Sequence, residues 1–168
     1  MRDHSNIIFL HGLEGTSRGV KATLLRSQFP GLLTPDFQGS LSERMAVLQP
    51  LLSQKSGWII IGSSFGGLMA AIYSLNYPSV VKRLILLAPA LIWPEFLALI
   101  PKAVNDIEEL CIVPTLVYHG TQDEIIPLQP VRLIAEKVFA NLEFREVDDD
   151  HGLYKTVHEI DWEKIIFP

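Results

Sequence analysis

The sequence predicts an α/β protein in which a mainly parallel sheet lies between two layers of helices, an α/β/α sandwich. Short apolar runs alternate along the chain with longer stretches of helical periodicity, as in successive βαβ units. Several runs, among them residues 59–61 and 84–87, are apolar at every position rather than at every second one. Such runs are typical of parallel strands that are buried on both faces of a sheet.

This pattern predicts six strands and five helices. The expected strands are residues 6–10, 32–35, 58–62, 83–88, 115–119 and 143–147. The expected helices are residues 21–28, 42–53, 65–76, 128–140 and 154–165. Residues 91–110 are ambiguous and are expected to hold short helices. The 168 residues contain no repeat, low-complexity tract or linker, so we expect one domain over residues 1–168.

Composition and charge exclude several classes of function. The apolar fraction of 48% and the charged fraction of 20% are those of a globular protein. The net charge of −5 gives no general attraction to nucleic acid phosphates, so no nucleic acid partner is expected. The single cysteine, Cys111, cannot form an internal disulfide or a multi-cysteine metal site. It is expected to be a small buried residue before a strand.

No segment has the length of a signal-peptide core or of a membrane span. The apolar stretch near the N-terminus covers only residues 7–10. The most apolar region, residues 84–93, is short and is interrupted by Pro89. We therefore expect a cytoplasmic protein without a membrane span, and the sequence predicts no oligomeric state.

The strongest chemical signal is the Gly-x-Ser-x-Gly turn at residues 62–66, between an expected strand and an expected helix. In this context the pattern carries a nucleophilic serine. Gly62 and Gly66 permit the sharp turn, because a side chain at either position would collide with neighbouring backbone. Ser64 would have a strained backbone and lie at a helix N-terminus, which favours developing negative charge. The alternative is a glycine-rich turn without chemistry.

Two other uses of a glycine-rich turn do not fit. A phosphate-binding P-loop needs Lys followed by Ser or Thr after its glycines, and here Leu68 and Met69 follow. A dinucleotide-binding turn needs a glycine where Ser64 stands.

An acid is expected in the loop after the strand at residues 115–119. The carboxyl ends of parallel strands share one sheet edge, so this loop and Ser64 should lie on the same side. Asp123 is the candidate and Glu124 its rival. Aspartate is the commoner acid of such sites. An ordinary acidic loop remains the alternative.

The base is expected after the last strand, where His151 follows three aspartates and precedes Gly152. One of the aspartates at 148–150 could instead be the orienting acid. The other histidines are weaker candidates. His158 lies in an expected helix, and His119 precedes a turn glycine and is expected to be structural.

Acyl transfer also needs hydrogen-bond donors for the developing oxyanion. One is expected to be the backbone N–H of Phe65, directly after the nucleophile. The other should come from the loop after the first strand, where Gly12 leaves the backbone free to turn an N–H inward; we assign it to Leu13. His11 is expected to support this loop by hydrogen bonds. A plain turn is the alternative.

Taken together, the motifs at residues 11–12, 62–66, 119–123 and 151–152 resemble the α/β-hydrolase superfamily in order and in the strands that they follow. The resemblance extends over residues 6–166 and favours Asp123 over Glu124. It implies a trimmed six-stranded sheet with strand order 2-1-3-4-5-6. It also implies no large cap domain, because only residues 89–113 are available for one.

The resemblance implies a serine hydrolase that acts on a carboxylic ester or thioester and needs neither metal nor cofactor. The loop at residues 13–22 is similar to the first loop of small cap-less esterases and thioesterases. Two alternatives stay open: a non-catalytic binding protein on the same scaffold, and a flavodoxin-like cofactor carrier. Four apolar residues after the fourth expected strand are candidates for an acyl pocket, although they could equally belong to the core. They are Leu91, Ile92, Trp93 and Phe96.

Overall fold

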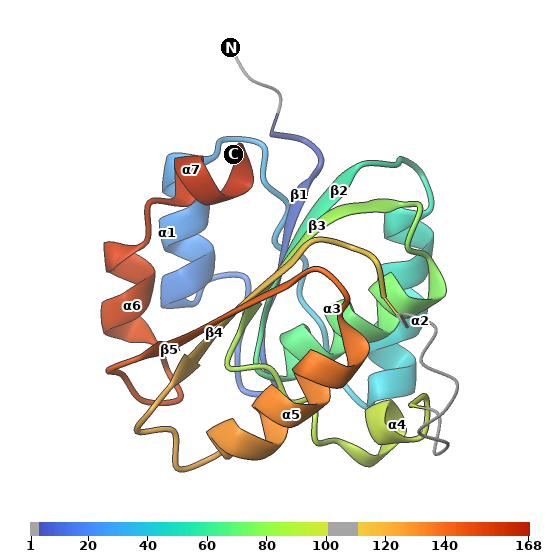
Figure 1. The fold of residues 1–168 in the computed structure, drawn as a ribbon. Coiled ribbons are helices and arrows are strands. Elements are labelled where there is room, and N and C mark those ends of the chain that lie inside the picture. The colour runs from blue at the N-terminus through green and yellow to red at the C-terminus, as the bar shows by residue number, and fades with distance from the viewer. Residues whose placement is uncertain (1–3, 101–110) are drawn as a thin grey trace.

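A computed structural model describes residues 4–100 and 111–168, and its centre is a parallel sheet of five strands (Figure 1). The strands are β1 (Ile7–Leu10), β2 (Trp58–Ser63), β3 (Val81–Leu87), β4 (Thr115–Gly120) and β5 (Leu142–Val147). They lie side by side in the order of the chain, and every neighbouring pair is parallel. The predicted parallel sheet is therefore confirmed.

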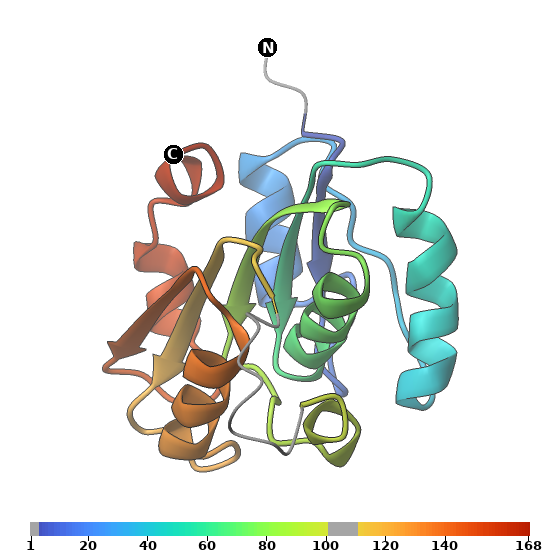
Figure 2. The same ribbon diagram turned by 45° about the vertical axis from the view of Figure 1, so that its right-hand side comes forward.

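Helices cover both faces of this sheet, which confirms the three-layer architecture (Figure 1 and Figure 2). On one face lie α1 (Val20–Gln28), α6 (Tyr154–Glu159) and α7 (Trp162–Ile166). On the other lie α2 (Leu41–Leu52), α3 (Phe65–Asn76), α4 (Pro94–Leu97) and α5 (Leu128–Val138).

Two apolar clusters, one on each face, form the core. Alternate residues of β2 belong to different clusters: Ile60 packs with α3, whereas Ile59 and Ile61 pack with α1. All three are almost completely buried. This explains why the central strands are apolar at every position, since each residue meets a helix layer on its own side.

The prediction of a sixth strand at residues 32–35 is wrong. Leu33 forms a single parallel bridge with Ile8, through the bonds Phe9 N–H to Leu33 O and Leu33 N–H to Ile7 O, each 2.9 Å long. The predicted place beside the first strand is thus correct. Pro35 has no N–H with which to continue such a ladder, and the chain leaves the sheet edge.

The described residues of two further segments, 154–165 and the connection between β3 and β4, contain short helices. The helix expected at residues 154–165 is two helices, because Asp161 begins α7 as its N-cap and accepts a hydrogen bond from the Lys164 N–H at 3.2 Å. Between β3 and β4 the described residues contain only α4, and residues 101–110 of the ambiguous segment lie outside the described part. None of the described helices is long and apolar enough to cross a membrane.

Candidate active site

Ser64 connects β2 to α3 in a backbone conformation that residues with a side chain rarely adopt. Its φ is 54° and its ψ is −114°. The Ser64 N–H donates to the Leu87 carbonyl at 2.9 Å, and its own carbonyl accepts from the Ala90 N–H at 3.0 Å. The end of β3 and the residues after it therefore hold the strained turn in place.

Two glycines make this turn possible. A Cβ at Gly62 would lie 2.5 Å from the Gly66 carbonyl oxygen, and a Cβ at Gly66 would overlap the Leu10 carbonyl at the end of β1. The collision expected from the sequence is therefore present at both positions. Because these contacts are with backbone, they could not be relieved by a side-chain rotation.

The structure brings Ser64, His151 and Asp123 together at the carboxyl edge of the sheet. His151 Nδ1 lies 2.8 Å from Asp123 Oδ2, and His151 Nε2 lies 3.0 Å from Ser64 Oγ. Since a carboxylate can only accept, the imidazole proton belongs on Nδ1, which leaves Nε2 to accept from the serine hydroxyl. The His151 side chain is 23% exposed, so the group is accessible from solvent.

The Asp123 side chain is fully buried and surrounded by donors. Its Oδ1 accepts from the backbone N–H groups of Ile125 and Ile126 at 2.9 and 2.8 Å, which leaves Oδ2 for His151. Its rival Glu124 is exposed. The two backbone bonds fix the carboxylate in the orientation that the imidazole needs.

His119 packs directly beneath this acid. It is completely buried, its Nε2–H donates to the Ile126 carbonyl at 2.9 Å, and Nε2 lies 3.2 Å from Asp123 Oδ2. Desolvation lowers the pKa of His119, which favours the neutral ring. His119 therefore has a structural role, as expected: it binds the Ile126 carbonyl and packs against Asp123 in the loop after β4.

The aspartates before His151 accept hydrogen bonds from groups other than the His151 imidazole. Asp149 Oδ2 accepts from the N–H and the hydroxyl of Thr156, both at 2.8 Å, and Asp150 Oδ1 accepts from the Gly152 N–H at 2.8 Å. Asp148 accepts from the Gln122 side chain at 2.7 Å. None of these three aspartates is hydrogen-bonded to the His151 ring, and the carboxylate beside its Nδ1 is that of Asp123. Within residues 4–100 and 111–168, no group of His, Cys, Asp and Glu could hold a metal ion.

The loop after β1 lies against the serine. A Cβ at Gly12 would be 3.4 Å from Ser64 Cβ, and the Gly15 N–H donates to the Gly12 carbonyl at 3.2 Å to close the turn. His11 supports the loop: Nδ1–H donates to the Gly12 carbonyl at 2.7 Å, and Nε2 accepts from the Phe37 N–H at 3.0 Å. This loop carries the predicted donor Leu13.

Phe65, the other predicted donor, begins α3. The first N–H groups of a helix have no partner within it, so the Phe65 N–H is available at the turn.

Arg44 of α2 is a feature of the site that the sequence analysis missed. Its guanidinium donates to the carbonyls of Gly12 and Leu13 at 3.4 and 3.3 Å and to that of Gly39 at 3.1 Å. It also lies over the Phe65 ring, 5.3 Å from the centroid, and the residue is only 3% exposed. The local sequence does not distinguish Arg44 from a solvated arginine on a helix. All of its hydrogen-bond acceptors are backbone carbonyls, and two of them lie more than 30 residues earlier in the chain.

The four candidates for an acyl pocket do not share one environment. Leu91 and Phe96, the latter in α4, are fully buried in the core cluster, and Ile92 is partly buried against it. Trp93 is 37% exposed and meets the Phe65 ring edge to face, with 5.3 Å between ring centroids. Of the four, only Trp93 is exposed.

An open depression of about 410 Å³ lies beside His151. Ile125 and Tyr154, both well exposed, contribute apolar surface to it, and Glu124 and Asp150 contribute carboxylates. A ligand at the triad would therefore be partly open to solvent.

Comparisons with known proteins agree with this architecture. The sequence matches the family described as alpha/beta hydrolase fold over residues 27–107. No curated protein matches it. Among solved structures, a putative hydrolase of the alpha/beta superfamily from Xanthomonas campestris pv. campestris is 26% identical, with a TM-score of 0.68 over 91% of each chain.

Two further structures share the fold at lower identity. The esterase EaEST from Exiguobacterium antarcticum is 16% identical, with a TM-score of 0.72 over 95% of this chain and 90% of its own. A monoacylglycerol lipase from Paleococcus ferrophilus is 17% identical, with a TM-score of 0.65 over 91% of this chain and 90% of its own.

Proposed function

We propose that this chain, which has the alpha/beta-hydrolase fold and matches the family of that description over residues 27–107, is a serine hydrolase that cleaves carboxylic esters or thioesters. One observation carries the proposal: Ser64 Oγ, both nitrogens of His151 and Asp123 Oδ2 form a continuous hydrogen-bonded chain, with distances of 3.0 and 2.8 Å. The strained serine at the start of α3 supports the same function.

In the proposed mechanism His151 Nε2 takes the proton of the Ser64 hydroxyl as Oγ attacks the acyl carbonyl carbon. The resulting imidazolium is stabilised by the Asp123 carboxylate. It then gives its proton to the departing alcohol or thiol as the bond from the acyl carbon to that group breaks. Water, deprotonated by His151, hydrolyses the acyl-enzyme and regenerates the Ser64 hydroxyl.

The negative charge that develops on the acyl oxygen is held by the backbone N–H groups of Leu13 and Phe65. Arg44 contributes indirectly, because it binds the Gly12 and Leu13 carbonyls and covers the Phe65 ring. Holding these carbonyls fixes the peptide planes of the loop, and with them the direction of its N–H groups.

The substrate class follows from the surroundings of the triad. No cofactor enters the proposed reaction. Trp93 offers an apolar surface beside Phe65, the residue after the nucleophile, and the depression beside His151 is open. These surroundings favour acyl groups of modest size, with the alcohol or thiol part extending toward solvent.

A fluorophosphonate probe tests the nucleophile directly. We expect covalent labelling of the wild-type protein and none of Ser64→Ala, whereas Ser63→Ala, a change at the neighbouring and largely buried serine, keeps the label. The same variants should then be assayed on a panel of short-chain nitrophenyl esters and acyl-CoA thioesters. Equal labelling or turnover by Ser64→Ala would place the nucleophile elsewhere. A folded wild-type protein that neither labels nor turns over any member of the panel would favour a binding role.

A further inference from the structure

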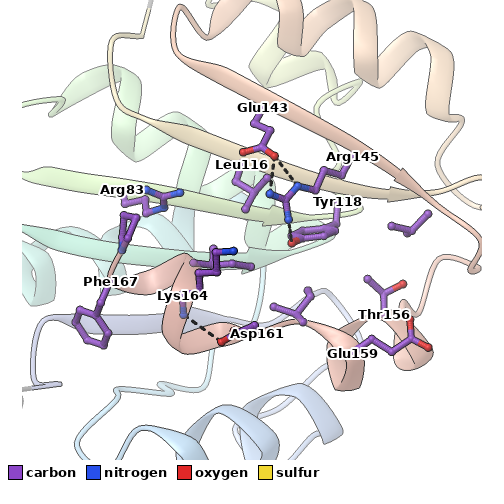
Figure 3. Close-up of a pocket in the computed structure, with 14 residues that line it drawn as sticks. Arg83, Leu116, Tyr118, Glu143, Arg145, Thr156, Glu159, Asp161, Lys164 and Phe167 are labelled. Atoms are coloured by element: carbon purple, nitrogen blue, oxygen red, sulfur yellow. Dashed lines mark hydrogen bonds and ion pairs between the residues drawn. The ribbon is translucent and has the colours of Figure 1, made fainter.

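A second cavity lies away from the triad, on the face of the sheet that α6 and α7 cover. It has a volume of about 760 Å³, which is within the range of small-molecule sites. Figure 3 shows it between the outer strands of the sheet and the C-terminal helices. Because the triad occupies the carboxyl ends of the strands and this pocket their face, the two sites use different surfaces.

The pleat of the strands explains which side chains form the floor. Leu116 and Tyr118 are two residues apart on β4 and both line the pocket. Their register partners on β5 are Glu143 and Arg145, which also line it. Side chains two residues apart lie on the same face. Short helices follow β5 instead of one long helix, so this part of the face is only partly covered. The far wall is apolar and comes from Ile165 of α7 and the residues after it.

Arg83 of β3 is the unusual group of the pocket. Its Nε is buried and has no hydrogen-bond partner among the described residues. A buried donor without a partner is unfavourable by the desolvation free energy of that group, so such groups are rare in folded proteins. The Nε–H and one Nη–H of a guanidinium point to the same side and match the two oxygens of a carboxylate.

None of the carboxylates that line the pocket accepts a hydrogen bond from the Arg83 Nε–H. Glu143 pairs with Arg145, which also donates to the Tyr118 hydroxyl at 2.6 Å. Asp161 accepts the Lys164 N–H as the N-cap of α7. Both pairs are drawn as dashed lines in Figure 3.

Positive charge is therefore left at one end of the pocket. In Figure 3, Arg83 projects from the sheet and Lys164 from α7 at that end. Glu159, the remaining carboxylate of the lining, is exposed.

We propose that this pocket binds an organic monocarboxylate with an apolar body, in which Arg83 holds the carboxylate and Leu116 and Ile165 contact the body. The three acidic residues of the lining disfavour ligands with a higher negative charge, such as phosphate esters. The unpaired guanidinium disfavours neutral apolar molecules, because they would leave its buried Nε–H without an acceptor. This site does not depend on the proposed hydrolase function.

The test is titration of the isotopically labelled protein with octanoate at pH 7, followed by NMR. We expect saturable shifts of the backbone signals of Leu116, Tyr118 and Ile165. Octan-1-ol, which has the same chain length and no charge, should bind at least about tenfold more weakly. Arg83→Gln, which keeps much of the side-chain length but loses the charge and the fork, should weaken octanoate binding by about tenfold.

Three controls make the outcome decisive. Lys82→Gln removes a charge from the exposed neighbour of Arg83 on the opposite face of β3 and should leave the affinity unchanged. Arg83→Lys keeps the charge but loses the planar fork, so its affinity for octanoate should lie between those of the wild type and Arg83→Gln. Ser64→Ala should show the same shifts as wild type, which separates this site from binding of a product at the triad. Equal binding of octanol and octanoate, affinity insensitive to Arg83→Gln, absence of saturable binding, or shifts confined to the surroundings of Ser64 would each overturn the proposal.

Discussion

Arg44 is a buried charge that forms no ion pair with a described residue and is instead held by three backbone carbonyls. Burial lowers the pKa of its guanidinium, and arginine remains protonated in proteins. A buried cation is unfavourable unless its donors are satisfied. Two of the three carbonyls belong to the loop that should carry an oxyanion donor, so Arg44 is a positioning residue of the proposed site.

The first prediction concerns this residue. Arg44→Met keeps the apolar stem but removes all three donated bonds, so the loop at Gly12 and Leu13 is no longer fixed. We expect kcat for a nitrophenyl ester to fall by about tenfold to a hundredfold with KM little changed, less than the loss of a whole oxyanion donor.

Two controls accompany Arg44→Met. Arg18→Met, at an exposed position, should leave both constants unaltered. Arg44→Lys should recover only part of the rate, because lysine cannot reach separate carbonyls with a planar fork. A rise in KM alone would assign Arg44 to substrate binding instead.

At the scale of elements, the turn between β2 and α3 depends on the close approach of the helix to β1. A Cβ at Gly66 would overlap the Leu10 carbonyl and lie 2.7 Å from that of His11. The same approach places Ser64 next to the loop after β1. Stability of the fold and geometry of the site are therefore coupled at this turn.

The second prediction follows from that contact. Gly66→Ala forces α3 away from β1 and should lower the free energy of unfolding by about 2 kcal/mol or more, measured by urea denaturation. Gly152→Ala is the matched control. Its added Cβ would meet the exposed ring of Tyr154 and, at 3.1 Å, the Asp150 carboxylate. Both are side chains that can move aside, so a smaller loss is expected. Equal losses in the two variants would argue against a rigid contact between α3 and β1.

At the scale of the whole molecule, stability should depend on pH through His119. Desolvation lowers the pKa of this histidine in the folded protein below the ordinary value of 6.5. Above that value both folded and unfolded chains carry a neutral ring. Below it the unfolded chain takes up a proton that the folded chain resists, so the free energy of unfolding falls as the pH falls.

The third prediction is that between pH 7 and 5 the wild type loses stability more steeply than His119→Gln, by at most about 1.4 kcal/mol per pH unit. The variant lowers stability at every pH because it disturbs the bond to Ile126, so the slopes and not the absolute values are compared. His158→Gln, at an exposed histidine of α6, should keep the wild-type slope. Parallel slopes for wild type and His119→Gln would contradict the prediction.

Much of the fold and the candidate site could be predicted because the signals are local. Periodicity in β2 and α3 reports which faces are buried, and the turn between them needs its two glycines whatever the rest of the chain does. Ser64, Asp123 and His151 could be named because each follows its own strand and parallel strands end on one edge.

Only the tertiary structure decided what depends on residues far apart in the chain. Leu33 pairs with β1 at one bridge and not as a strand, because pairing depends on the path of the chain past Pro35. The distances within the triad, the bonds of Arg44 to the loop after β1 and the unpartnered Nε of Arg83 come from contacts between separate elements. A hydrogen bond is set by atomic positions within a few tenths of an ångström, and no pattern of residue types along the chain carries that information.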